Sequence, residues 1–252
     1  MALSQTHIKL GTLGDWLAEH GVMLAGMEST GIYWRTVFEA LESRLQCWLL
    51  NAQHLHNVPG RKTDVADSAW ICQLVEHGLV RPSFVPPPEI RALRDLTRLR
   101  KAHIEERTRA IQRVEKVLQA AGIKLTSVAS KAYSVSGRAM LEALVAGTTD
   151  GAVLAELARG RLRSKIPALT EALAGRFTAE HHGVLVAQLL AHLDGLDHSI
   201  AALDERVGER TAHLEDLIDL LCTIPGVKKR TAETLVAECG ARWASDMIPR
   251  FD

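Results

Sequence analysis

A repeated apolar spacing near the C-terminal end of the chain constrains the fold more than any other feature. Apolar residues there recur in steps of four and three: Leu189, Leu193, Leu196, Ile200, Leu203 and Val207. This spacing places one apolar seam along a helix and is typical of coiled coils. It predicts a long helix over residues 184–214. Gly195 lies within it and costs about 1 kcal/mol of helix propensity, so packing must compensate.

A second long helix is predicted from about Glu89 to Ala121, directly after the break at Pro86–Pro88. Its heptad is imperfect, because one seam is apolar whereas the companion seam contains Arg100 and Arg107. The two helices could pair within one chain or between chains. Between them, residues 122–180 alternate short helical runs with glycine-containing breaks, which is typical of a connector.

The N-terminal part of the chain has an α/β pattern. Residues 22–27 form a continuous apolar run, as expected for a buried strand of a parallel sheet, and residues 46–51 are the next predicted strand. Helical periodicity over residues 36–44 joins them into a βαβ unit. Glu28 then lies at the carboxyl end of the first strand, where open α/β sheets bind ligands.

Two further carboxylates, Asp64 and Asp67, stand at the start of a predicted helix. Residues three apart share a helix face, so both can meet one cation. Together with Glu28 they offer the oxygen ligands that Mg²⁺ prefers beside a phosphodiester. The alternative needs no metal, because an N-cap aspartate and a first-turn aspartate both stabilise a helix start.

Composition limits the class of protein. The chain has 252 residues, 47% of them hydrophobic, and a net charge of zero. No apolar run approaches the roughly 20 residues of a membrane span, and the N-terminus has no signal-peptide pattern. The four cysteines are too widely spaced for a CxxC site, which fits reduced cytosolic thiols.

Nucleic-acid binding is predicted from charge distribution, because residues 53–125 contain 13 Lys or Arg against 8 Asp or Glu. The predicted contacts are Arg61, Lys62, Arg100, Arg107 and Arg109. The alternative is a solvated helix face in which these cations pair with acidic neighbours on the same helix. A run of cations at residues 159–165 could extend the basic surface.

Residues 220–238 resemble a helix-hairpin-helix, in which a Pro-Gly turn aims the second helix's positive end at a DNA phosphate. The predicted contacts are Gly226, Lys228, Lys229 and Arg230. Lys228 replaces the second glycine of the usual pattern. The alternative is an ordinary helical hairpin within a core.

Several motifs, in order, resemble the DEDD transposases of bacterial insertion sequence family one-ten. They begin at Glu28, Asn51, Pro59, Ser83 and Ile90: ESTGIYW, NA, PGRKTDVAD, SFVPP and IRALRDLTR. The resemblance implies a RuvC-like (RNase H-like) domain that binds Mg²⁺ through four acidic residues, a coiled coil, and a C-terminal domain that supplies a serine nucleophile. Glu28, Asp64 and Asp67 match the second, third and fourth acids. The first acid and the serine have no counterpart, which predicts a fragment truncated at both ends.

The expected fold is therefore α-rich α/β. We expect a truncated RuvC-like domain at residues 1–85, a helical coiled-coil region at 86–213, and the start of a C-terminal helical domain at 214–252. The resemblance implies a transposase of the bacterial cytoplasm that cleaves and transfers DNA strands. Its expected partners are DNA, a guide RNA encoded by the element, and a second copy of the chain bound through the coiled coil.

The missing first acid predicts that this chain alone is inactive. One alternative is a non-catalytic nucleic-acid-binding oligomer. Another is a RuvC-like junction nuclease, for which Asp15, at an expected helix start, is the early candidate for the missing acid.

Overall fold

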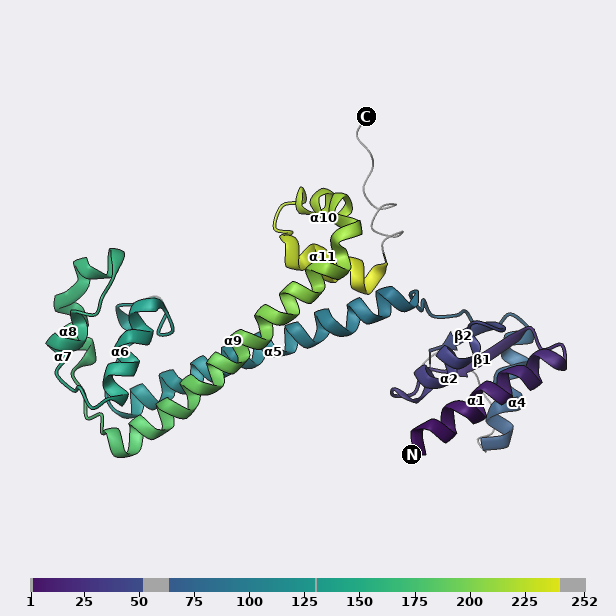
Figure 1. The fold of residues 1–252 in the computed structure, drawn as a ribbon, viewed down its shortest axis with the longest axis horizontal. Coiled ribbons are helices and arrows are strands. Elements are labelled where there is room, and N and C mark those ends of the chain that lie inside the picture. Colours follow the sequence, from purple (N-terminus) through teal and green to yellow (C-terminus); the bar gives the residue numbers. More distant parts are fainter. Residues whose placement is uncertain (1, 52–63, 130, 241–252) are drawn as a thin grey trace. The chain divides into compact units, whose positions relative to one another are not determined.

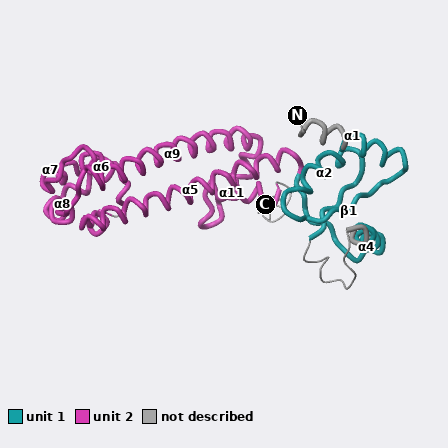
Figure 2. The backbone as a smooth tube through the Cα atoms, turned by 90° about the horizontal axis from the view of Figure 1, so that it is seen from below, with its two compact units in different colours: residues 1–86 teal, residues 87–252 magenta. Residues whose placement is uncertain are grey.

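The computed structural model describes residues 2–51, 64–129 and 131–240. The chain consists of two compact units, residues 1–86 and 87–252, shown in separate colours in Figure 2. Each is described by itself below. Within the described residues, no helix is both long and apolar enough to cross a membrane.

The described residues of unit 1 form a two-stranded sheet and the helices that accompany it (Figure 1): α1 (Ala2–Glu19), β1 (Leu24–Glu28), α2 (Tyr33–Leu41), β2 (Gln46–Leu50) and α4 (Asp64–Glu76). β1 and β2 are parallel and pair in register from Leu24↔Gln46 to Glu28↔Leu50. The predicted βαβ unit is thus confirmed. The first strand begins two residues later than expected, because a turn at Gly21, with φ of +68°, precedes it.

The sheet of unit 1 is covered on one face by α4. A Cβ on Gly26 would lie 3.1 Å from Val75 Cγ2 and 3.4 Å from Ile71 Cγ2, so the missing side chain lets the helix approach β1 closely. Leu50 and Leu74 are almost fully buried in the small core beside this contact. Since side chains alternate along a strand, Glu28 lies on the same face as Gly26.

The helix α1 begins well before Asp15, where a helix start was expected. It contains Asp15 in its interior rather than at a helix start, and Arg44 Nε donates to Asp15 Oδ1 at 2.8 Å. Asp15 therefore does not lie at the end of a strand, as the first acid of a RuvC-like site would. This placement corrects the expectation on which the junction-nuclease alternative depended.

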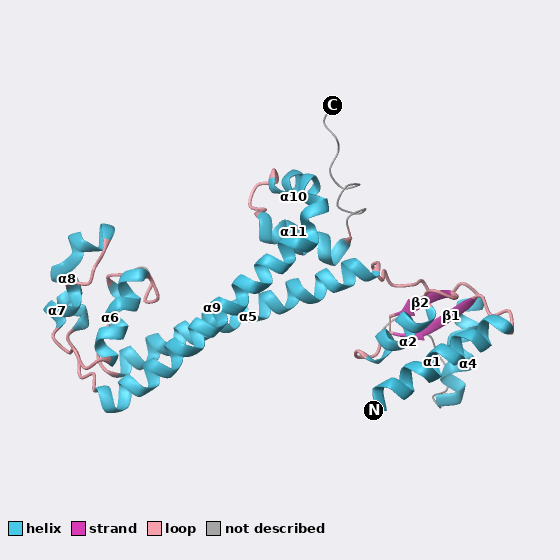
Figure 3. Cartoon of the chain, viewed as in Figure 1, coloured by secondary structure: helices cyan, strands magenta, loops and turns pink. Residues whose placement is uncertain are grey.

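Unit 2 is built on two long helices, α5 (Pro88–Ala120) and α9 (Val184–Thr211), which confirm the two predicted helices. The chain leaves along α5 and returns along α9, so the helices lie side by side and antiparallel (Figures 1 and 3). Leu193, Leu196, Ile200 and Val207 of the predicted seam are buried. The helices pair within one chain, which is one of the two arrangements that the sequence allowed.

Residues 121–183, here called the tip, join α5 to α9. They form α6 (Val135–Val145), α7 (Gly151–Ala155) and α8 (Ile166–Leu173), together with short helical turns including η1 (Leu125–Ser127) and η2 (Gly160–Lys165). Met140, Leu141, Leu154 and Leu169 are fully buried between these helices. The expected connector is thus a packed helical region, whose residues share one hydrophobic core with Val114 and Leu118 of α5 and with Val186 and Leu190 of α9.

After α9 the chain forms a helical hairpin, α10 (Glu215–Cys222) and α11 (Lys229–Cys239). Its core joins Ile218, Leu221 and Val236 to Leu93 of α5 and Val207 of α9. The hairpin therefore packs on the open ends of the two long helices. Overall the fold is α-rich with a small parallel sheet, whereas the RuvC-like assignment, the helix-hairpin-helix and the three predicted domains stay predictions.

Candidate acidic site and nucleic-acid surfaces

Glu28 ends β1 on the sheet face that α4 covers. The backbone N–H of Ser29 donates to the Leu50 carbonyl at 2.9 Å, which extends the strand pairing past Glu28. Thr30 Oγ1 donates to Glu28 Oε1 at 2.8 Å, in a turn that Gly31 completes with φ of +58°. These contacts fix one carboxylate oxygen at the carboxyl end of the sheet. Glu28 Oε2 has no hydrogen-bond donor within the described part of the chain and keeps its capacity to bind a cation.

Asp64 and Asp67 begin α4, the helix that packs on the same sheet face as Glu28. Their side chains lie outside what the structure describes, as do Arg61 and Lys62 altogether. Among the side chains that are described, no group of three His, Cys, Asp or Glu could hold a metal ion. The carboxylate of Glu28 fits a hard cation, and the convergence of Asp64 and Asp67 on it stays a prediction.

The predicted contact residue Arg100 is buried. Arg100 is 3% exposed, and its Nη1 donates to Glu233 Oε2 at 2.6 Å and to Asp204 Oδ1 at 3.0 Å. Arg107 pairs with Asp197 of α9 and lies over the Tyr133 ring. Both arginines were predicted to contact nucleic acid. In the structure they instead bind carboxylates of α9 and α11, because these helices pack against α5. A phosphate would have to displace these partners.

Two more arginines of α5 hold the end of α11. Arg94 donates to the backbone carbonyls of Ala237 and Glu238, at 3.0 and 2.8 Å, and thereby caps the helix C-terminus. Arg98 makes two hydrogen bonds of 2.8 Å to the Glu238 carboxylate. This paired contact lowers the pKa of Glu238, because hydrogen bonds from a guanidinium favour the ionised carboxylate.

A different face of α5 carries exposed cations. Arg109, which the sequence predicted, is exposed, and so are Arg113 and Lys116. None of the three makes an ion pair with any residue in the described ranges. Steps of four and three place them on one helix face. Sequence reasoning missed Arg113 and Lys116, although their spacing from Arg109 was the signal that could have identified them.

The predicted Pro-Gly turn lies between α10 and α11. Gly226 has φ of +87°, a conformation that favours glycine. Lys228 and Lys229 stand exposed at the start of α11 and make no ion pair with the residues that the structure describes. Arg230, the fourth predicted contact, instead pairs with Asp204 of α9. Gly226, Lys228 and Lys229 therefore stay candidates for binding a phosphate.

Comparison with known proteins identifies the family. Residues 2–123 match the family model DEDD_Tnp_IS110, described as Transposase, and the matched region spans unit 1 and α5. No curated protein matches the chain. Residues 2–123, which comprise unit 1 and α5, thus carry the sequence pattern of the IS110 family of DEDD transposases.

Proposed function

We propose that this transposase cleaves and transfers DNA strands with Mg²⁺ held by Glu28, Asp64 and Asp67. The observation that carries the proposal is the position of Glu28, at the carboxyl end of β1 on the face covered by α4. Asp64 and Asp67 begin that same helix. The contact of α4 with β1 supports the proposal, which requires the side chains of Asp64 and Asp67 to reach the cation that Glu28 binds.

The chemistry assigned to these residues is electrostatic. Mg²⁺, when bound, polarises a phosphodiester and stabilises the charge that develops in the transition state. Glu28 would offer Oε2 as a ligand while Thr30 holds Oε1 at 2.8 Å and fixes the orientation of the carboxylate. Gly26 permits the close contact of β1 with α4, so a larger residue there would move the acids of α4 away from Glu28.

DNA binding is assigned to two sets of exposed cations. Arg109, Arg113 and Lys116 form one face of α5, and Lys228 and Lys229 stand at the start of α11. Neither set is neutralised by an ion pair within the described residues. Such cations bind phosphates irrespective of base sequence, so sequence recognition would need another source. Pairing with a guide RNA encoded by the element is part of the proposal.

Homo-oligomerisation is also part of the proposal, but the interface is no longer the coiled-coil seam that the sequence suggested. The apolar seam of α9 is covered by α5 of the same chain, with Leu193, Ile200 and Val207 buried. A second copy would therefore bind through another surface, or would have to displace α5.

Strand cleavage tests the acidic site. The purified chain is incubated with Mg²⁺, labelled DNA from the element's ends and the element's RNA, and products are resolved on a sequencing gel. Because the sequence predicts that this chain alone is inactive, the first measurement is whether the unmodified chain forms any product, and product formation would contradict that prediction. Where products form, we expect Glu28→Gln to lower their yield by more than about 100-fold, beyond the 10 to 100-fold typical of residues that only support a metal ligand. Glu39→Gln is the matched control, because Glu39 is an exposed acid of α2. Products that persist at full yield in Glu28→Gln would contradict the proposal.

A further inference from the structure

The tip contains a pocket of about 770 Å³, formed by residues 126–129, 131, 134–136, 159–162 and 165. All of these residues follow residue 123, where the family match ends. The volume is within the range of about 300–1,000 Å³ that small-ligand sites occupy. The pocket is therefore large enough for a nucleotide unit of a nucleic-acid strand.

The lining of this pocket is basic. Lys131, Arg159, Arg161 and Lys165 contribute four cations, and none of the described lining residues is acidic. Lys131, Arg159 and Arg161 make no ion pair with any residue that the structure describes, and Lys165 Nζ donates only to the Val128 carbonyl, at 3.3 Å. In contrast, Arg163, which does not line the pocket, lies 4.0 Å from Glu156. The positive charge of the pocket is left uncompensated.

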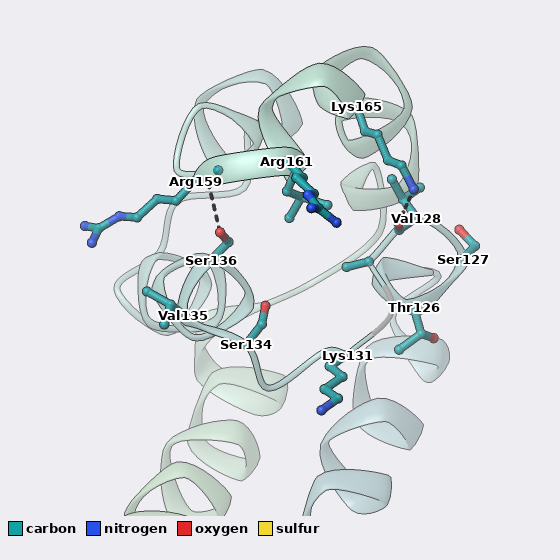
Figure 4. Close-up of a pocket in the computed structure, with 13 residues that line it drawn as sticks. Thr126, Ser127, Val128, Lys131, Ser134, Val135, Ser136, Arg159, Arg161 and Lys165 are labelled. Atoms are coloured by element: carbon teal, nitrogen blue, oxygen red, sulfur yellow. Dashed lines mark hydrogen bonds between the residues drawn. The ribbon is translucent and has the colours of Figure 1, made fainter.

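The basic side chains differ in direction, and in Figure 4 the Lys131 side chain extends away from the space between Ser134 and Val128. Figure 4 shows Arg161 reaching from η2 toward the gap between Ser134 and Val128, whereas the Arg159 guanidinium extends away from it. The Arg159 backbone N–H donates to Ser136 Oγ at 2.9 Å, which joins η2 to the start of α6. Arg161 is therefore the cation best placed to contact a ligand inside the pocket.

Hydroxyl groups add hydrogen-bond donors. Ser134 Oγ accepts from the Gly137 N–H at 3.1 Å, and Ser136 Oγ accepts from Arg159. Neither hydroxyl donates its own hydrogen to an acceptor within the described residues, and Ser136 is only 6% exposed. A buried hydroxyl hydrogen without an acceptor is costly, and a phosphate oxygen would accept it.

We propose that this pocket binds a phosphate group of a nucleic-acid strand, with Arg161 as the ionic contact and Ser134 and Ser136 as hydroxyl donors. The choice of nucleic acid over a free phosphate compound rests on the proposed function. The tip then provides a phosphate contact in addition to the two sets of exposed cations on α5 and α11.

Binding of the full chain to labelled oligonucleotides of mixed sequence, measured by fluorescence anisotropy at several salt concentrations without Mg²⁺, tests the pocket. We expect Arg161→Gln to weaken binding about tenfold, equally for different sequences, and to lower the slope of log affinity against log salt by about 0.7 to 0.9 for each lost phosphate contact. Arg163→Gln, which removes the same charge two residues away, should leave the slope close to that of the unmodified chain.

Equal slopes for Arg161→Gln and Arg163→Gln would overturn the proposal, because the effect would then belong to the general field of the surface. Calorimetric titration with inorganic phosphate distinguishes a site for nucleic-acid phosphate from a site for a free phosphate compound. Phosphate binding that is lost in Arg161→Gln while oligonucleotide binding is unchanged would also overturn it, in favour of a small phosphate ligand. Neither measurement requires strand cleavage, so failure of the acidic site leaves this test intact.

Discussion

A single arginine illustrates how position in the fold decides the role of a charge. Arg100 lies in a heptad seam that also contains Arg107, and its side chain is 4% exposed beside a Glu233 side chain that is equally buried. Removing one member of such a pair leaves the other charge buried without a partner, which is far more costly than losing an exposed pair. Arg100 thus joins α5 to α11 and to Asp204 of α9.

We predict that Arg100→Met lowers the free energy of unfolding of unit 2 by about 3 to 5 kcal/mol, measured by urea denaturation. The double variant Arg100→Met/Glu233→Leu should recover a large part of that loss, since no buried charge is left. Arg98→Met is the control, because Arg98 is exposed and its pair is worth at most about 1 kcal/mol. A loss of under 1 kcal/mol in the Arg100 variant would contradict the buried pair.

At the scale of elements, α5 divides its cations between two roles. Arg94, Arg98, Arg100 and Arg107 hold the C-terminal hairpin and α9, whereas the exposed face that begins at Arg109 is free for phosphate. Glycines show a similar dependence on packing. Gly137 in α6 and Gly195 in α9 are both helical, but a Cβ on Gly137 would lie 1.9 Å from the Ala132 carbonyl oxygen, and one on Gly195 would meet nothing within 4 Å.

The same substitution should consequently have opposite signs at these two sites. Gly195→Ala is expected to raise the free energy of unfolding by up to about 1 kcal/mol through helix propensity. Gly137→Ala is expected to lower it by about 1 to 3 kcal/mol, because the backbone must shift to admit the methyl group. Urea denaturation of both variants measures the difference, and stabilisation by both would show that the contact at Ala132 relaxes freely.

For the whole molecule, the division into two units has a consequence for unfolding. Each described hydrophobic cluster consists of residues of one unit. Leu74 lies in the core of unit 1 and Leu193 in a core of unit 2. Domains with separate cores can unfold in separate transitions. Four of the five tryptophans lie in residues 1–86, so tryptophan fluorescence reports mainly on unit 1.

We predict that Leu74→Ala lowers the stability of unit 1 by about 2 to 5 kcal/mol and shifts the fluorescence transition alone. Leu193→Ala should shift the far-ultraviolet circular dichroism transition of the helical unit and leave the fluorescence transition in place. Parallel shifts of both signals in both variants would mean that the two units unfold as one cooperative body.

Local patterns determined the elements of this protein. Apolar spacing located α5 and α9 to within a few residues, and the apolar run with its helical neighbour predicted the parallel pair β1 and β2 with Glu28 at its end. These features follow from the periods of helix and strand, which are properties of the chain segment itself. The family resemblance, also visible in short motifs, agreed with the match over residues 2–123.

Only the tertiary structure decided which charges are available. Arg100 and Arg109 have the same chemistry and lie on one helix. Arg100 is buried against Glu233, which is far away in sequence, whereas Arg109 is exposed. The tip pocket arises in the same way, because residues near 126, 136 and 161 meet only after the tip core has formed. Pairing between residues distant in sequence depends on packing, and no local period of the sequence encodes it.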